Sequence, residues 1–287
     1  MDKFNYQQLQ YKKFIPEKTW ALALAVVGLI GGVILISLHL GTSSSSLLSC
    51  GGGARGTKNP GNATSLQMEA IRHYATSRVV PQQSFGEITL SFDVLRRTAP
   101  CNFLVFGLGH DSLMWASLNP GGTTLFLEED PKWVQTVLKD APALRADTVK
   151  YRTQLQQADE LLRHYQNEPD CSVIKSFLRG NEKCRLALNM LSDKVYDTEW
   201  DLIMVDAPRG YFAEAPGRMA AIYSAAVMAR NRKKSGVTHV FLHDVDRKVE
   251  KQYAEKFLCR KYRVNAAGRL WHFEIPPAAT ATGGDFC

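Results

Sequence analysis

The strongest constraint on the fold of this chain lies in residues 101–130, where two apolar runs are separated by a glycine turn and a short helical segment. The first run, residues 103–106, leads into Gly107-Leu108-Gly109, and the second, residues 124–127, leads into Glu128-Glu129-Asp130. Strand, glycine turn, helix, strand and acid follow one another in this order in the first unit of a nucleotide-binding α/β sheet. We therefore predict a Rossmann-like α/β fold with helices on both faces of the sheet.

The glycine turn also indicates the kind of ligand. Glycine lets the backbone turn tightly and approach a ligand closely, so Gly107 and Gly109 are predicted to contact a cofactor. The full dinucleotide fingerprint has a third glycine, where this chain has Ser112. A two-glycine turn favours an adenosyl ligand without a pyrophosphate, with S-adenosylmethionine as the first candidate. Glu128 is predicted to bind its ribose hydroxyls, with Glu129 as the alternative, because a carboxylate accepts from both hydroxyls.

Polar residues follow the next predicted strands as well. The apolar runs at residues 200–206 and 237–242 end in Asp206 and in His243-Asp244. Ligands gather at the carboxyl ends of parallel strands, so Asp206 is also predicted to lie at the cofactor. For a hydroxyl acceptor, Asp206 and His243 are the candidate bases, with Asp244 as the carboxylate that orients the imidazole. The structural alternatives are that Asp206 only caps a turn and that His243 only forms hydrogen bonds with the backbone at the end of its strand.

The sequence is also compatible with two further kinds of ligand, a divalent cation and an acidic substrate. Asp206, Asp244 and Asp246 together could hold a divalent cation, since oxygen ligands suit Mg²⁺ or Mn²⁺. Arginine forks bind carboxylates and an aromatic ring stacks on a sugar face. The residues predicted to bind an acidic substrate in these ways are Arg209, Arg218, Arg269 and Tyr211. The net charge of +7 agrees with an acidic ligand, and no basic block of nucleic-acid type is present.

The N-terminal part of the chain has the pattern of a membrane anchor. Residues 20–40 carry no formal charge, and about 20 such residues span a bilayer. Four lysines precede this run, which predicts that residues 1–19 form a cytosolic tail. Residues 41–65 are rich in Ser and Gly and read as a flexible luminal stem with a glycosylation sequon at Asn62. Residues 66–287 are then the luminal catalytic domain.

The six cysteines form no CxxC pair, so their spacing does not indicate a zinc site. Cys171 with Cys184, and Cys259 with Cys287, are candidate disulfides in an oxidising compartment, although sequence does not fix the pairing. Cys101 is predicted to be a buried apolar residue. Further strands are predicted at residues 148–151 and 269–275, and further helices at residues 131–139, 155–165, 214–230 and 250–258.

Five motifs together resemble one protein family: residues 101–122, 125–133, 196–211, 214–232 and 240–250. They are similar to the plant glucuronic acid 4-O-methyltransferases of cell-wall polysaccharide synthesis, over about residues 66–287. The resemblance implies a Rossmann-like S-adenosylmethionine-dependent methyltransferase sheet preceded by one transmembrane helix. It also implies a single-pass type II Golgi membrane protein that methylates O4 of glucuronosyl residues.

The resemblance extends to a substrate class. Residues 79–88, 119–124 and 269–276 are most similar to the arabinogalactan methyltransferases, which modify cell-surface proteoglycans, whereas the xylan enzymes tend to differ at residues 119–124. Glucuronoxylan is the alternative substrate. A non-catalytic Golgi scaffold is the alternative of a different class, but the turn at residues 107–111 keeps the GLGHD pattern of the active enzymes.

Overall fold

The computed structural model describes residues 60–172, 176–278 and 286–287. The predicted cytosolic tail and membrane span, and most of the predicted stem, lie outside the described residues. In the described part of the chain, no helix is both long enough and apolar enough to cross a bilayer. Helix α2 (Pro60–Thr76) begins before Leu66, where the sequence predicts the start of the catalytic domain.

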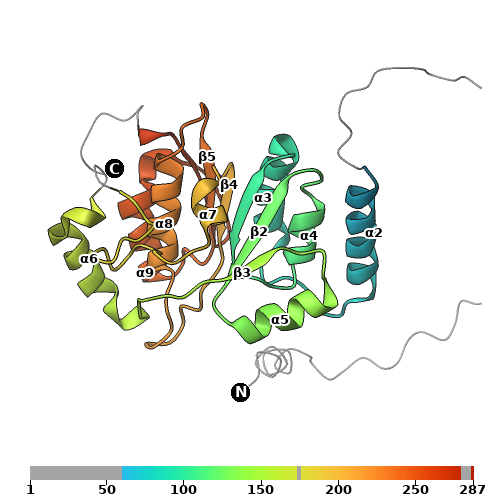
Figure 1. The fold of residues 1–287 in the computed structure, drawn as a ribbon, viewed down its shortest axis with the longest axis horizontal. Helices are drawn as coiled ribbons and strands as arrows, with labels where there is room; N and C mark the ends of the chain where they lie inside the picture. Colours follow the sequence, from blue (N-terminus) through green and yellow to red (C-terminus); the bar gives the residue numbers. More distant parts are fainter. Residues whose placement is uncertain (1–59, 173–175, 279–285) are drawn as a thin grey trace, which may run out of the picture. The chain divides into compact units, whose positions relative to one another are not determined.

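A seven-stranded sheet forms the centre of the described part (Figure 1). Its strand order is β3-β2-β1-β4-β5-β7-β6. β1 to β5 are parallel, and β7 runs antiparallel to both of its neighbours. The strands are β1 (Asn102–Phe106), β2 (Thr123–Glu128), β3 (Ala146–Thr148), β4 (Leu202–Val205), β5 (Thr238–Leu242), β6 (Arg263–Ala267) and β7 (Leu270–Ile275). The strand order reverses between β1 and β4, which is where such a sheet binds its ligand.

Alternation along β1 divides the core into two layers. Phe103 and Val105 pack on one face of the sheet, while Leu104 and Phe106 pack on the other. Both faces are covered, which explains why the run is continuously apolar rather than alternating. The predicted Rossmann-like sheet with helices on both faces is confirmed.

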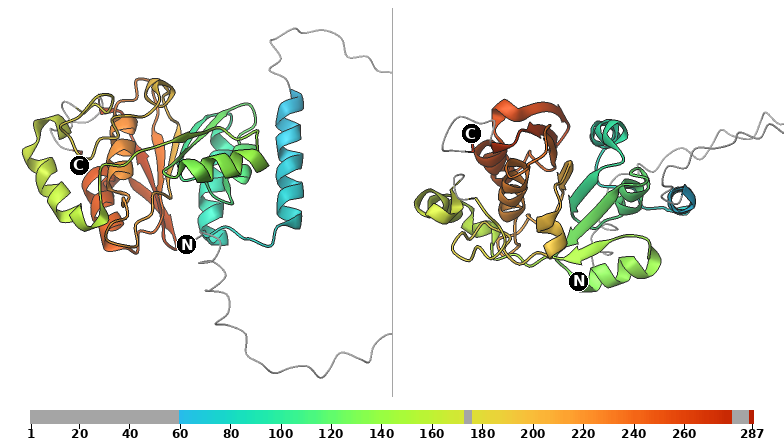
Figure 2. Two further views of the ribbon diagram at one scale, coloured as in Figure 1. Left: turned by 60° about the horizontal axis from the view of Figure 1, so that its bottom comes forward. Right: turned by 45° about the horizontal axis from the view of Figure 1, so that its top comes forward.

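The helices fall into two groups by the face that they cover (Figure 2). One face carries α3 (Phe85–Thr98), α4 (Ser112–Ser117) and α5 (Pro131–Asp140), and α2 packs on the outside of α4. The other face carries α6 (Ala158–Asn167), α7 (Asp193–Asp197), α8 (Met219–Arg230), α9 (Lys248–Tyr253) and the π-helical turn η4 (Ala254–Leu258). Short 3₁₀ turns are η1 (Leu155–Gln157), η2 (Pro169–Cys171) and η5 (Arg260–Tyr262).

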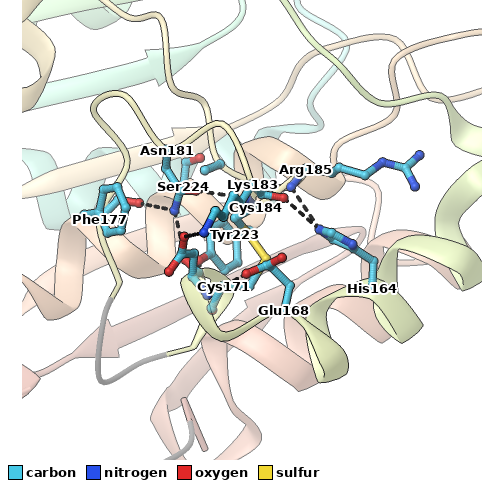
Figure 3. Close-up of a disulfide and its surroundings, with 12 residues drawn as sticks. His164, Glu168, Cys171, Phe177, Asn181, Lys183, Cys184, Arg185, Tyr223 and Ser224 are labelled. Carbon is cyan, nitrogen blue, oxygen red and sulfur yellow. Dashed lines mark hydrogen bonds and ion pairs between the residues drawn. A yellow bond between two sulfur atoms is a disulfide. The ribbon is translucent and has the colours of Figure 1, made fainter.

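A disulfide holds the long connection between β3 and β4 (Figure 3). Cys171 and Cys184 are both fully buried, and the Tyr223 hydroxyl of α8 donates to the Cys171 carbonyl at 3.0 Å. The second disulfide joins Cys259 to Cys287 and ties down the end of the chain. Both predicted pairings are confirmed, and Cys101 is buried and free as expected.

Cys171 and Cys184 are 13 positions apart, so their disulfide closes a short loop in the unfolded chain. The double substitution Cys171→Ala/Cys184→Ala should lower the free energy of unfolding by about 3 kcal/mol, because it removes this restriction of the unfolded chain. Denaturant titration of the purified protein measures the change. An unfolding midpoint equal to that of the wild type would contradict the prediction.

Candidate active site

The glycine turn after β1 has one closed side and one open side. Gly107 has φ +123°, and a Cβ there would lie 3.2 Å from the Cβ of Ala207. A side chain at Gly107 therefore strains the fold itself, whether or not a ligand is bound. Gly109 is exposed, and a Cβ there would meet only the Asp111 carboxylate, at 3.1 Å. The side of the turn that a ligand can approach is thus at Gly109.

The predicted ribose carboxylate lies beside this turn. Glu128 ends β2, is only 4% exposed, and accepts from the backbone N–H groups of Leu108 and Asp130 at 3.2 Å each. The Trp133 indole donates to the Leu108 carbonyl at 2.6 Å from the next helix. The turn is therefore fixed from both sides, with the carboxylate of Glu128 at its edge.

Glu129, the alternative ribose ligand, has another partner. Its carboxylate accepts from Nε of Arg209 at 2.5 Å and from the Arg209 backbone N–H at 3.3 Å. This ion pair joins the end of β2 to the loop after β4. Both carboxylates thus have partners within the protein. Glu128 stays the first candidate for the ribose because it contacts the glycine turn itself, and Glu129 stays the alternative.

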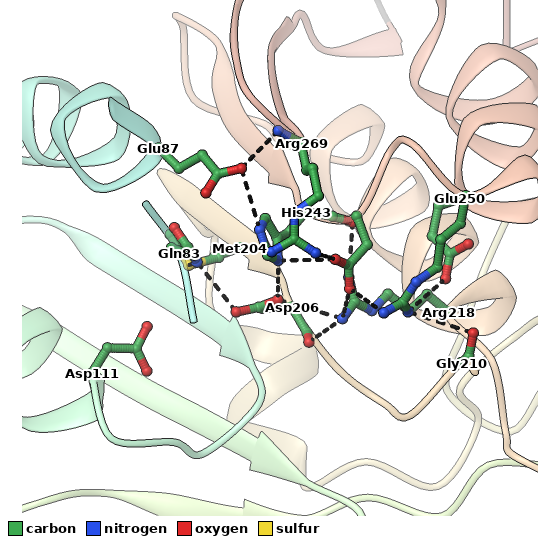
Figure 4. A network of polar contacts seen from close by, with 12 residues as sticks. Gln83, Glu87, Asp111, Met204, Asp206, Gly210, Arg218, His243, Glu250 and Arg269 are labelled. Atoms are coloured by element: carbon green, nitrogen blue, oxygen red, sulfur yellow. Dashed lines mark hydrogen bonds and ion pairs between the residues drawn. The ribbon is translucent and has the colours of Figure 1, made fainter. Parts of the chain in front are cut away.

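Asp206, at the end of β4, is the centre of a polar network (Figure 4). Its Oδ1 lies 2.8 Å from Nδ1 of His243 and 3.4 Å from Nη2 of Arg218, and its Oδ2 accepts from the Gln83 amide at 3.2 Å. Burial alone raises the pKa of Asp206, but the hydrogen bond from His243 and the charge of Arg218 outweigh it and leave the pKa below its ordinary value. Asp206 is therefore an ionised carboxylate, and its side chain is 25% exposed.

His243 lies behind Asp206 rather than at the surface of the site. Its side chain is 1% exposed, and Nε2 lies 3.5 Å from Oε1 of Glu87 without a hydrogen bond. Burial lowers the pKa of His243, but the bond to Asp206 and the charges of Asp206 and Asp244 raise it above its ordinary value overall. This position does not fit the predicted base at the acceptor, because a buried ring cannot touch a substrate. His243 instead positions Asp206.

Asp244 is held by arginines and does not orient His243. Its Oδ2 lies 2.8 Å from Nη2 of Arg218 and 2.9 Å from Nη2 of Arg247, and its Oδ1 lies 2.6 Å from Nη1 of Arg269. Nδ1 of His243 is 3.6 Å from Asp244 but only 2.8 Å from Asp206. The orienting carboxylate is thus Asp206, contrary to the sequence prediction.

The predicted substrate-binding residues differ in exposure. Arg218 is buried and is bound to Asp206, Asp244 and the carbonyl of His243, so it cannot reach a substrate. Arg209 and Arg269 have side chains that are about two-fifths exposed, at 40% and 42%. Tyr211 is exposed and lies edge to face with Phe212. The roles of these three residues stay predictions.

A cation site would use a different set of residues from the one predicted. Ligand atoms of Asp206, His243 and Asp244 lie within 4.8 Å of one another, whereas Asp246 is exposed and outside this group. The guanidinium of Arg218 already bridges the two carboxylates, at 3.4 and 2.8 Å. The positive charge at this place is therefore supplied by the protein itself.

Several residues around Asp206 and Asp244 were not predicted, among them Gln83, Glu87, Asp111 and Arg247. Ser84 and Glu87 form a capping box at the start of α3, and the sequence pattern Ser-x-x-Glu signals such a helix start. Oε1 of Glu87 also accepts from the backbone N–H of Arg269 at 2.7 Å. Asp111 follows the glycine turn and faces Asp206 (Figure 4). Burial, and then the charge of Asp206, raise the pKa of Asp111 to about 6.

Comparison with known proteins identifies relatives of this chain. The chain is 63% identical to arabinogalactan O-methyltransferase 1 of Arabidopsis thaliana, over 94% of this chain and 96% of the relative. It is 50% identical to glucuronoxylan 4-O-methyltransferase 2 of the same plant, over 78% and 76% of the two chains. A solved methyltransferase-like protein from Silicibacter pomeroyi is 16% identical with a TM-score of 0.38, over 70% and 90% of the two chains. The family IRX15/IRX15L/GXM matches residues 86–273, and the chain belongs to this family.

Proposed function

We propose that the protein is an O-methyltransferase that moves the methyl group of S-adenosylmethionine to O4 of glucuronic acid on arabinogalactan. The observation that carries this proposal is the 63% identity to an arabinogalactan O-methyltransferase over nearly the whole of both chains. The identity to a glucuronoxylan enzyme is lower and covers a smaller part of the chain. The site geometry supports a nucleoside ligand at the switch point of the sheet.

The residues around the glycine turn fit S-adenosylmethionine. Gly109 leaves the turn open on one side, and Glu128 places a buried carboxylate beside it, which suits a pair of ribose hydroxyls. The bound sulfonium would supply an already activated methyl group. The protein then has to position the acceptor hydroxyl in line with that methyl group and to accept its proton.

Asp206 is the residue that fits the task of base. It is the ionised and partly exposed member of its pair with His243, so of the two only Asp206 can touch an acceptor hydroxyl. Gln83 and His243 hold its two oxygens and fix the orientation of the carboxylate. Arg209, Arg269 and Tyr211 are the exposed groups that we assign to the glucuronic acid carboxylate and ring.

Methyl transfer to two acceptors tests the proposal. The enzyme is incubated with labelled S-adenosylmethionine and either deesterified arabinogalactan or unmethylated glucuronoxylan. Label on arabinogalactan is the expected result. Label on xylan alone would keep the chemistry but exchange the substrate, and absence of both transfer and cofactor binding would favour a non-catalytic scaffold.

The location and the cation belong to the proposal as well. We assign residues 20–40 to a single membrane span that places the catalytic domain in the Golgi lumen, which protease protection of intact Golgi vesicles tests. The two disulfides agree with an oxidising compartment. The divalent cation stays a prediction. Dialysis against a chelator followed by addition of Mn²⁺ tests it through the loss and recovery of activity.

Substituting Gly109 by valine should weaken binding of S-adenosylhomocysteine at least 10-fold while the thermal midpoint stays close to that of the wild type. The valine side chain would occupy the open side of the turn. The backbone at residue 109 can accept a side chain without strain, because φ of Gly109 does not lie in the positive range that favours glycine. Isothermal titration calorimetry measures the affinity. Gly86→Val is the matched control, since a Cβ at Gly86 meets nothing within 4 Å. Unchanged affinity in Gly109→Val would place the cofactor elsewhere.

A further inference from the structure

Asp111 is a carboxylate that forms no ion pair among the described residues. It stands at the N-cap position of α4, yet its side chain makes no capping hydrogen bond. Instead Oδ2 accepts from the indole of the fully buried Trp115 at 2.7 Å. One oxygen is thus held by the core, and besides this bond the carboxylate interacts with its own backbone N–H and, through space, with His243. An oxygen of a carboxylate has two lone pairs, so Oδ1 can accept from a further donor.

The other oxygen, Oδ1, lies beside the glycine turn. Oδ1 of Asp111 lies 3.1 Å from the place that a Cβ on Gly109 would occupy, which is the open side of the turn. On its other side the carboxylate faces Asp206 (Figure 4). Asp206 has its own partners, because Arg218 and His243 both contact it. Among the residues that the structure describes, no arginine or lysine contacts Asp111, so a cationic group of a ligand would find an anionic partner there.

Gln83 supplies a second unsatisfied acceptor on this side of Asp206. Its amide nitrogen donates to Asp206, while its Oε1 is buried without a hydrogen-bond donor among the described residues. A buried polar atom without a partner costs free energy, and a bound ligand that donates a hydrogen bond removes that cost. An acceptor at the glycine turn and a second acceptor beside Asp206 therefore suit a ligand group that is both cationic and a multiple donor.

An ammonium group has these properties, since it carries a positive charge, three donors and no acceptor. A sulfonium carries the charge but donates nothing. We propose that Asp111 is a specificity residue that accepts a hydrogen bond from the α-ammonium group of the methionine part of S-adenosylmethionine, with Oε1 of Gln83 as a second acceptor. This inference rests on the proposed function, because it assigns a part of the same cofactor. Trp115 holds the carboxylate in place.

Three ligands separate the parts of the cofactor. S-adenosylhomocysteine has the ammonium without the sulfonium, and 5′-methylthioadenosine has neither. Their affinities and that of S-adenosylmethionine are measured by calorimetry for the wild type and for Asp111→Asn, which keeps the size of the side chain and an acceptor for Trp115. Asp111→Asn should weaken binding of S-adenosylmethionine and S-adenosylhomocysteine by a similar factor of about 10 to 100 and leave 5′-methylthioadenosine within twofold. Asp140→Asn, on the exposed end of α5, is the control and should change none of them.

The comparison between ligands keeps the test independent of folding. A variant with less folded protein loses active fraction for all three ligands alike, so the ratio of their dissociation constants is unaffected. An equal loss for all three would show a structural role and overturn the inference. A loss for S-adenosylmethionine that greatly exceeds the loss for S-adenosylhomocysteine would assign Asp111 to the sulfonium and also overturn it. If the wild type bound none of the three, the proposed function itself would fail.

Discussion

Replacement of Arg218 by methionine should lower the free energy of unfolding by about 3–5 kcal/mol, because it leaves buried charges without their partner. Nη2 of Arg218 lies 2.8 Å from Asp244 and donates to the Asp206 carbonyl at 2.6 Å. Nη1 donates to the His243 carbonyl at 2.8 Å. Methionine fills most of the volume but can replace none of these hydrogen bonds. Denaturant titration at neutral pH measures the loss.

The pH dependence of the same variant identifies the cause. In the wild type, the lowered pKa of Asp206 contributes stability that is present at neutral pH and is lost as the pH falls through that pKa. Without Arg218 this contribution shrinks, so the gap in stability between wild type and variant should narrow under acid. Arg96→Met is the control, since Arg96 pairs with Asp93 at an exposed position, and it should change the stability by less than about 1 kcal/mol. A gap for Arg218→Met that is equally large at every pH would point to lost packing rather than lost charge.

The site residues that come directly after the buried strands could be predicted from the sequence. In a parallel sheet, the residue after each buried run must lie at the same edge, which is why Glu128, Asp206 and His243 could be placed near the glycine turn. Asp130 could be predicted in the same local way as the cap of α5, where it accepts from the N–H groups of Lys132 and Trp133.

Most partners of these residues could not be predicted, because they come from distant segments. Arg218 and Arg269 reach Asp244 from two other loops, whereas Arg247 follows Asp244 by three positions, and no local pattern states which acid an arginine will join. The same holds for Gln83, which lies before the first strand and reaches Asp206 across the sheet edge. Long-range pairing decided which of the candidate residues are buried and which are open to a ligand.

Some element boundaries also differ from the pattern. The predicted helix at residues 214–230 begins only at Met219, because Pro216 lacks an N–H and Gly217 has φ +67°. The predicted strand at residues 148–151 is instead β3 (Ala146–Thr148), a short edge strand without the continuous apolar run of β1. At such places a proline, a glycine or an edge position sets the boundary, and the hydrophobic periodicity alone does not show it.

Substitution of Asp206 by asparagine should lower kcat for methyl transfer by about 10²–10³-fold, because it removes the proposed base for the acceptor hydroxyl. Asparagine has almost the same size and keeps an oxygen for His243, but it carries no charge and cannot accept a proton at neutral pH. The affinity for S-adenosylhomocysteine should stay within about threefold of the wild type, since the ribose and ammonium contacts are assigned to Glu128 and Asp111. Initial rates at saturating cofactor and calorimetry of the product complex give the two quantities.

The comparison with His243→Gln separates touching the acceptor from positioning. Glutamine can still donate to Asp206, so the carboxylate remains in place and kcat should fall by only about 10-fold, because a neutral amide holds the carboxylate less firmly than the imidazole does. A loss in His243→Gln as large as in Asp206→Asn would mean that the pair acts as one unit and that proton acceptance cannot be assigned to Asp206 alone. If Asp206→Asn lost cofactor affinity and kcat by similar factors, Asp206 would be assigned to cofactor binding instead of to the acceptor. Its position at the end of a strand is compatible with that role as well.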